Sequence, residues 1–203
     1  MRSFDARRWR LFWNEVMNEF KIPDDLQRCV DFHGHLCPGV VIGYCAAKLG
    51  MKLLSTNRAS DEECIAIVEN DSCAVDAIQV LTGCTFGKGN LFFRDYGKMV
   101  FTFATRSNHH SVRLRFEPNS QSNWDNLPEN QRQKRRIEFM LSHDPEELFD
   151  IRNIPLACLP ATAQIQETIP CDYCNEMVMA SRLRQYGKKH ICIPCDEAVQ
   201  KGE

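Results

Sequence analysis

The stretch His33-Gly34-His35-Leu36-Cys37-Pro38-Gly39 places two imidazoles and a thiol within five positions and ends in Pro-Gly. Proline cannot continue a helix that precedes it but suits the first position of a new one, so we expect Cys37 at a helix N-terminus. Backbone N–H groups and the helix dipole at that position favour a thiolate. Cys37 is therefore a candidate metal ligand or nucleophile. The alternative is a tight turn with a buried cysteine and two hydrogen-bonded histidines.

A second stretch, Asn70-Asp71-Ser72-Cys73, repeats this arrangement. It follows the apolar run 64–69, which is typical of a buried strand, and it precedes a predicted helix at 74–81. Asp71 or Ser72 can cap that helix, which places Cys73 at its N-terminus. Two distant parts of the chain thus share one chemical design, a cysteine at the start of a helix.

The remaining pattern indicates an α+β core. Apolar periodicity predicts helices at 9–20, 24–32, 40–49, 74–81 and 129–141, and a short helix that begins at Asp144. Apolar runs predict strands at 64–69, 99–104 and 111–117, and one more within 151–160. The runs 99–104 and 111–117 suit an antiparallel hairpin, with His109 and His110 at its tip rather than on a metal. We therefore expect a mixed or antiparallel sheet with packed helices.

Glycines have predicted roles in one of these helices and in one loop. Gly50 is expected to end the helix at 40–49, and the small residue Gly43 would let that helix pack closely against another element such as a sheet. The loop 83–90 resembles a phosphate-binding loop only superficially, because the four-residue gap and the Ser or Thr after the lysine are missing. It is either a plain turn or a pocket lining, in which Lys88 contacts an anion and Asn90 donates a hydrogen bond.

Composition limits the class of protein. The chain has 203 residues and a net charge of −2, so no global field recruits nucleic acid or an anionic membrane. Polar residues interrupt the N-terminal segment where an export signal would need an apolar core, and the longest nearly uncharged run, 40–47, is too short to span a bilayer. Eleven cysteines without an export signal favour metal ligation or thiol chemistry over disulfides. We expect a soluble cytoplasmic protein with no membrane partner.

The C-terminal part carries the most specific motif. Cys171-x2-Cys174 and Cys192-x2-Cys195, separated by seventeen residues, fall within the spacing of a four-thiolate zinc module. We predict a structural zinc ion here, because such small units take their folding energy from the metal. A helix after Cys195 would complete a treble clef. The expected organisation is a core domain at 1–160, a linker at 161–169 and a zinc finger at 170–203.

With these residues assembled, the chain resembles the FmdE family, proteins similar to the FmdE component of formylmethanofuran dehydrogenase, with a C-terminal finger of the TraR/DksA kind. The resemblance rests on Phe32–Gly39, on Asp71–Leu91 and on Asp95–Lys98. It implies an α+β core, a homodimer, and an active site lined by cysteine and histidine whose reaction is poorly defined.

Two functions follow as hypotheses. In the first, the chain is an enzyme or enzyme subunit that acts on a small substrate, one-carbon or anionic. Its candidate catalytic residues are His33, His35, Cys37, Asp71, Cys73 and Lys88. His33, His35, Cys37 and Cys73 would hold a second transition metal, and without a metal His33 or His35 would deprotonate Cys37.

In the second hypothesis, the chain is a non-catalytic zinc-binding partner or regulator. Its basic segment 182–190 would then dock a protein or nucleic acid.

Overall fold

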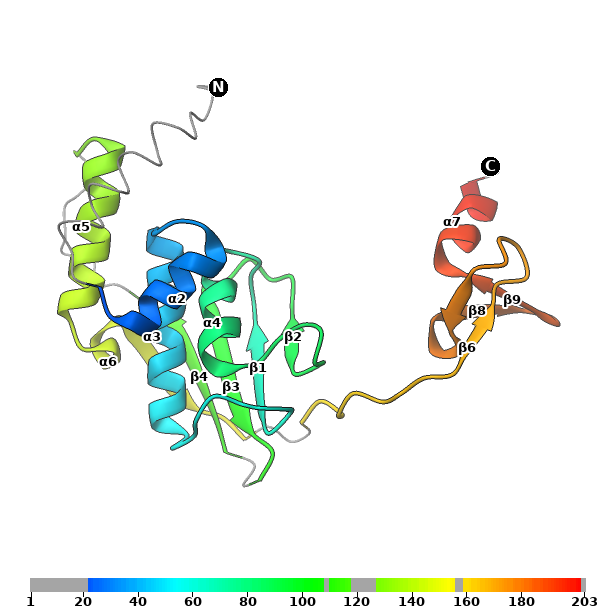
Figure 1. Ribbon diagram of the computed structural model, residues 1–203, viewed down its shortest axis with the longest axis horizontal. Helices are drawn as coiled ribbons and strands as arrows, with labels where there is room; N and C mark the ends of the chain where they lie inside the picture. Colours follow the sequence, from blue (N-terminus) through cyan, green and yellow to red (C-terminus); the bar gives the residue numbers. More distant parts are fainter. Residues whose placement is uncertain (1–21, 108–109, 118–126, 156–158, 202–203) are drawn as a thin grey trace. The chain divides into compact units, whose positions relative to one another are not determined.

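The computed structural model describes residues 22–107, 110–117, 127–155 and 159–201. The chain divides into two compact units, residues 1–162 and residues 163–203 (Figure 1). The helix predicted at 9–20 and His109 lie outside the described residues. Within them no helix is both long enough and apolar enough to cross a membrane.

The first unit is built on a five-stranded mixed sheet, as the α+β prediction requires. Its strands are β1 (Cys64–Val68), β2 (Leu91–Phe93), β3 (Val100–Thr105), β4 (Ser111–Phe116) and β5 (Phe149–Asn153), in the order β2-β1-β3-β4-β5. β2 pairs with β1 in parallel, and the other pairs are antiparallel. The predicted hairpin is β3–β4, with Phe103 opposite Val112. The sequence did not predict β2, because a strand of three residues is too short to show an alternation of apolar and polar side chains.

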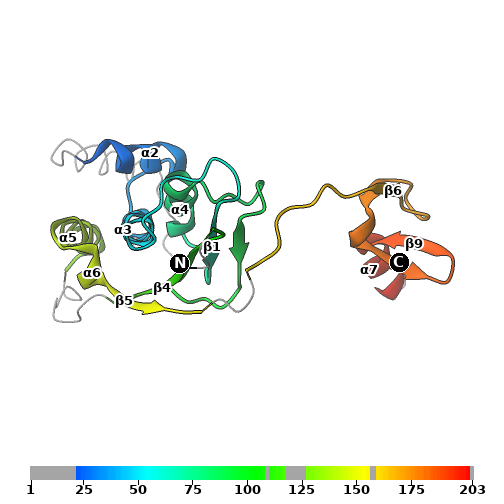
Figure 2. The ribbon, with the colours of Figure 1, turned by 90° about the horizontal axis from the view of Figure 1, so that it is seen from below.

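Helices α2 (Asp24–His33), α3 (Pro38–Leu53) and α4 (Ala74–Thr82) lie on one face of this sheet (Figures 1 and 2). Two further helices, α5 (Glu129–Ser142) and the single turn α6 (Pro145–Leu148), precede β5. The Asp144 carboxylate caps α6 by accepting from the Glu146 N–H at 3.0 Å. The helix–sheet core includes Leu26, Val40, Ala66, Val68 and Phe101, all almost fully buried.

Gly50 does not end α3, contrary to the sequence prediction, and the helix runs to Leu53. A Cβ atom at Gly50 would lie only 2.4 Å from Cδ2 of Phe103. The glycine therefore serves the packing of α3 on β3 and not the termination of the helix.

The same lack of a side chain brings α3 against α4. A Cβ at Gly43 would lie 2.1 Å from the Ala74 carbonyl oxygen, and one at Gly39 would lie 2.9 Å from Cys73 Cβ. The close approach predicted for this part of α3 is thus to a helix rather than to a sheet. It sets the first turns of α3 and α4 side by side, and each of these turns begins at a cysteine.

The second unit contains two short hairpins and a helix. β6 (Thr168–Pro170) pairs with β7 (Met177–Met179), and β8 (Leu183–Tyr186) pairs with β9 (Lys189–Cys192), each antiparallel. A 3-10 turn, η1 (Ala180–Arg182), joins the hairpins, and α7 (Ile193–Lys201) follows β9 directly. The Tyr186 hydroxyl donates to Asp196 Oδ1 at 2.6 Å, which ties the second hairpin to the helix.

Candidate metal centres

The core unit brings His33, Cys37 and Cys73 together, and we call these three residues the core cluster. One ligand atom from each lies within 4.8 Å of the others. His33 is the last residue of α2, whereas Cys37 and Cys73 are the N-caps of α3 and α4. Three helix ends therefore converge on one point, and a short connection and the glycine contacts of α3 fix their separation.

The turn between His33 and Cys37 is set by Gly34. This residue ends α2 in the left-handed region, at φ 96°, and its N–H donates to the Val30 carbonyl at 2.7 Å. Glycine adopts this conformation without the strain that a side chain would cause. The chain then reverses, so that His33 Nε2 lies 3.8 Å from Cys37 Sγ.

Asp76 orients the His33 ring. Its Oδ2 lies 2.7 Å from His33 Nδ1, so that Nδ1–H donates to the carboxylate and the lone pair of Nε2 faces the sulfurs. A carboxylate behind a histidine is the usual second partner of a metal-bound imidazole. Sequence reasoning missed Asp76. The available signal was its position three residues after Cys73, as the one acid in an otherwise apolar first turn.

Cys37 is protected from solvent. Its side chain is 9% exposed and accepts a hydrogen bond from the Val40 N–H at 3.5 Å. Burial raises the pKa of the Cys37 thiol to about 12, and the neighbouring Cys73 adds to the increase, whereas the Val40 N–H opposes it. The expectation that the helix N-terminus favours the thiolate is therefore wrong for the metal-free site, because desolvation outweighs the helix.

Two other predicted site residues, His35 and Asp71, are not part of the core cluster. His35 is exposed and lies beside His33, with the ring centroids 4.6 Å apart and the ring planes tilted by 40°, but it is not one of the clustered ligands. Burial, and then the nearby His33, lower the pKa of His35. Asp71 is exposed on the path into α4.

Lys88 is not brought to the core cluster. Its Nζ donates to the backbone carbonyls of Ala59 and Asp61, each at 3.2 Å. The Asn90 side chain donates to the carbonyls of Asp61 and Cys64, each at 3.0 Å. Both residues thus hold the glycine-containing loop to residues 59–64, which lead into β1. The sequence prediction assigned this role to neither.

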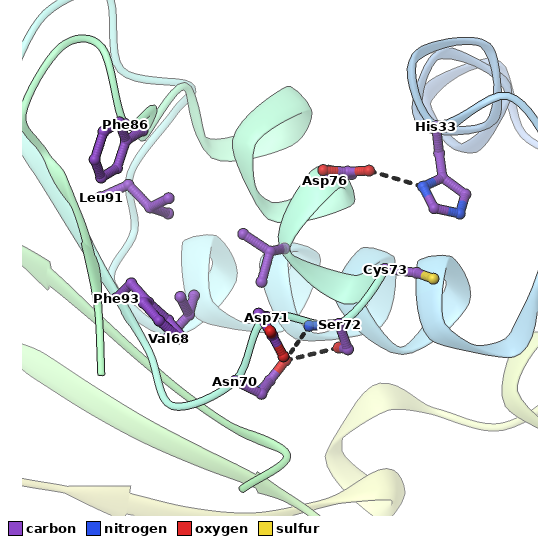
Figure 3. A pocket seen from close by; sticks show the side chains of 11 residues that line it. His33, Val68, Asn70, Asp71, Ser72, Cys73, Asp76, Phe86, Leu91 and Phe93 are labelled. Atoms are coloured by element: carbon purple, nitrogen blue, oxygen red, sulfur yellow. Dashed lines mark hydrogen bonds and ion pairs between the residues drawn. The ribbon is translucent and has the colours of Figure 1, made fainter. Parts of the chain in front are cut away.

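A cavity of about 440 Å³ opens next to the core cluster (Figure 3). Its walls come from α2, the end of β1, the start of α4, and the loop and strand around β2. The lining residues are His33, Val68, Asn70, Asp71, Ser72, Cys73, Val75, Asp76, Phe86, Leu91 and Phe93. Cys37 does not line it. The core cluster therefore has an inner side at Cys37 and an accessible side at His33 and Cys73.

The second unit gathers Cys171, Cys174, Cys192 and Cys195, which we call the tail cluster; their sulfur atoms lie within 4.8 Å of one another. The first pair sits on the turn after β6, and the second spans the junction of β9 and α7. Cys171 Sγ accepts from the backbone N–H groups of Tyr173 at 3.4 Å and Cys192 at 3.3 Å. Backbone donors, those of Cys174 and Cys192 first, lower the pKa of Cys171 to about 6.

Comparison with known families identifies the core. The model of the family described as "FmdE, Molybdenum formylmethanofuran dehydrogenase operon" matches residues 32–150, more than half of the chain. The chain belongs to the FmdE family. The matched region contains His33, Cys37 and Cys73 together with α3, α4 and the end of α2, so the family resemblance that the sequence predicts for the core is confirmed.

Two individual proteins are also similar to this FmdE-family chain. A curated protein from Archaeoglobus fulgidus, "Probable S-adenosyl-L-methionine-binding protein", is 28% identical over 211 residues, covering 92% of this chain and 56% of the relative. This chain thus spans about half the length of that relative. A crystal structure of a tungsten formylmethanofuran dehydrogenase FmdE-like protein from Syntrophus aciditrophicus matches with a TM-score of 0.65 at 24% identity, covering 84% of this chain and 89% of that one. This second likeness shows the fold.

The separations within both clusters suit a tetrahedral metal ion. Sulfurs that each lie about 2.3 Å from one zinc ion are about 3.8 Å apart in tetrahedral geometry. A nitrogen about 2.1 Å and a sulfur about 2.3 Å from the ion are about 3.6 Å apart in the same geometry. Cys174 Sγ and Cys192 Sγ are 3.9 Å apart, and His33 Nε2 and Cys37 Sγ are 3.8 Å apart. Both clusters could therefore hold a metal ion. The tail offers four protein ligands, whereas the core offers three among the described residues.

Proposed function

We propose that this FmdE-family chain is an enzyme or an enzyme subunit whose active site is the core cluster and its cavity. The observation that carries the proposal is the number and position of the ligands. His33, Cys37 and Cys73 provide three ligand atoms beside a cavity, and a catalytic metal site keeps one position open. Thiolate and imidazole ligands suit zinc or a similar transition metal.

The residues of the chain have separate tasks in this proposal. Cys37 anchors the ion from the buried side, and Cys73 and His33 hold it from the cavity side. Asp76 keeps the Nδ1–H tautomer of His33, so that Nε2 remains the ligand atom. His35, whose pKa is lowered, is a neutral imidazole at pH 7 and is the candidate proton acceptor. A bound ion would supply a Lewis-acidic centre that activates water or polarises a carbonyl.

We also propose that the tail cluster binds structural zinc in a treble-clef finger. The support is the closed set of four sulfurs, together with the succession of turn, hairpin β8–β9 and helix α7. All four positions of a tetrahedral ion are used by protein ligands, so this site has no position for a substrate.

Cobalt substitution tests the proposed active site. The chain should take up two Co²⁺ ions, and added cyanide should shift the visible d–d bands of the core ion alone. The Cys171→Ser variant should retain the cyanide response, and the Cys73→Ser variant should lose it. A single cobalt ion per chain that is lost in Cys171→Ser, or a Cys171→Ser protein that binds cobalt but does not respond to cyanide, would contradict an open active-site metal.

A second candidate function rests on the charge of the second unit. Arg182, Arg184, Lys188 and Lys189 are exposed, and none of them forms an ion pair with a described residue. Such a basic hairpin would suit a regulator that binds nucleic acid through its tail. Salt-dependent binding to a random DNA or RNA duplex, abolished by Arg184→Glu with Lys188→Glu and retained in Cys73→Ala, would favour this function.

A further inference from the structure

The cavity beside the core cluster has an uneven charge. Asp71 and Asp76 line it, whereas no lysine or arginine does among the residues described. One oxygen of Asp76 is bonded to His33. Asp71 is exposed and forms no hydrogen bond or ion pair within the described part of the chain. A ligand in the cavity therefore meets at least one carboxylate that has no cation to neutralise it.

The cations in neighbouring segments are occupied elsewhere. Lys88 is held by backbone carbonyls at 59–61. The Arg94 guanidinium donates to the Tyr96 hydroxyl at 3.4 Å, and the Lys98 ammonium lies over the Tyr96 ring, 5.7 Å from its centroid. None of these three side chains lines the cavity. The anionic substrate expected from the sequence, with Lys88 as its contact, has no cationic partner there.

An apolar wall faces the metal ligands. Phe86, Leu91 and Phe93 lie on the opposite side of the cavity from His33 and Cys73 (Figure 3). Phe86 is 77% exposed and Phe93 is 47% exposed, so the surface of both rings is available to a ligand in the cavity. The faces of such rings attract organic cations as well as apolar groups.

Metal loading leaves this charge pattern in place. Two thiolates balance the two charges of a divalent ion, so a loaded core cluster of His33, Cys37 and Cys73 adds no net charge. The carboxylates then still set the sign of the potential in the cavity. An anion would be repelled by them, and a cation would be attracted at the end of the cavity that carries the ligands.

We propose that this cavity binds an organic cation, in which a quaternary ammonium, sulfonium or protonated amine is joined to an apolar or aromatic part. The cationic group lies near Asp71 and Asp76, and the apolar part packs on Phe86, Leu91 and Phe93. The inference rests on the proposed function in that it names the ligand class of the same site. It concerns binding alone and involves no bond-making step.

Two probes of matched shape and opposite charge test the inference. Benzyltrimethylammonium and benzylsulfonate should be titrated into zinc-loaded protein at fixed ionic strength, with amide NMR shifts as the readout. The cation should bind at least about tenfold more tightly and should shift the signals of Asp71, Phe86 and Phe93. Equal affinities, or tighter binding of the sulfonate, would overturn the proposal.

Substitutions in the cavity test whether the preference for a cation arises at Asp71 and Phe86. Asp71→Asn should weaken binding of the cation by about threefold to tenfold and leave the sulfonate no weaker. Glu147→Gln removes the same charge from an exposed position on α6 that does not line the cavity, and it should change neither affinity. Phe86→Ala, at an exposed turn position, should weaken binding of the cation through the lost ring. An unchanged cation affinity in both Asp71→Asn and Phe86→Ala would refute the assigned site.

The same titration on the zinc-loaded Cys73→Ser protein, in which the tail keeps its metal and the core should have none, separates this inference from the proposed function. If cobalt binding shows no core metal but the cation is still preferred, the ligand class stands and the metal proposal fails. If the core metal binds and the sulfonate is preferred, the metal proposal stands and the ligand class fails.

Discussion

The tail cluster and the core cluster offer a metal ion related sets of ligands in different arrangements. The tail takes four cysteines from one short segment, Cys171–Cys195, and backbone N–H groups support the sulfur of Cys171. The core takes three ligands from the ends of three helices and leaves its remaining side toward a cavity. A closed set of ligands stabilises a fold, whereas an incomplete set beside a cavity is available for chemistry.

The two clusters also differ in what holds them in place. The tail unit is small and has a minor core, formed by Cys171, Ile191 and Cys192 with a few partly buried neighbours. The core cluster lies on a large apolar core that includes both faces of α3. Metal should therefore be required for folding in the tail, and folding should be required for metal binding in the core.

The largest effect should come from Cys171→Ser. Loss of one tail ligand should release the metal and unfold residues 168–201, because the unit has too little buried apolar surface to fold alone. Amide hydrogen exchange would show complete loss of protection in the tail with the core unchanged. Cys73→Ser is the reciprocal control and should leave the tail protected. A tail that remains protected in Cys171→Ser would refute the dependence on metal.

The next effect should come from Gly43→Ala. Its Cβ would lie 2.1 Å from the Ala74 carbonyl oxygen, so α3 and α4 must separate. We expect a loss of about 1–3 kcal/mol in unfolding free energy of the core and a marked drop in core metal content. Gly87→Ala is the matched control, because nothing lies within 4 Å of the added Cβ. Denaturant unfolding and metal analysis would measure both effects, and full metal content in Gly43→Ala would show that the helix contact does not set the cluster.

Asp76→Asn should act on the core metal alone. Without the carboxylate the His33 ring loses its fixed tautomer, and metal affinity should fall by about 10-fold to 100-fold with little change in fold. Competition with a chromophoric chelator would measure the affinity. Asp71→Asn, which removes a carboxylate that is not bonded to His33, should bind metal normally. Equal affinities for the two variants would remove Asp76 from the metal site.

The smallest effect should come from Cys45, a buried thiol that is not part of the core cluster. Burial raises the pKa of Cys45 to about 12, above its ordinary value of 9.0. The folded chain keeps this proton while the unfolded chain loses it, so the contribution to stability is complete below about pH 9 and is lost as pH rises toward 12. Between pH 8 and 10.5, urea unfolding should show a fall in stability that is about 2 kcal/mol larger in the parent than in Cys45→Ala, with the steepest part above about pH 9. Identical slopes would be the contrary result.

Much of this organisation was accessible from sequence because it is local. The spacing of Cys171, Cys174, Cys192 and Cys195 defines a ligand set within one short segment, and Pro38 and Ser72 mark the helix starts that follow Cys37 and Cys73. Apolar period predicted α3, α4 and the β3–β4 hairpin.

What sequence could not supply depends on contacts between distant segments. The role of Gly50 depends on Phe103, and the partner of Asp76 is 43 residues away. The high pKa of Cys37 arises from burial by elements that no local pattern reveals. Lys88 looked like a pocket cation because its loop is rich in glycine, but the carbonyls that hold it come from 59–61.

Anomalous diffraction at the zinc absorption edge, on a crystal of the zinc-loaded chain, tests the central claim most directly. We predict two peaks per chain, one among the four tail sulfurs and one within bonding distance of His33 Nε2, Cys37 Sγ and Cys73 Sγ. A single peak at the tail, with no density for an ion between His33 and the two core sulfurs, would contradict the account.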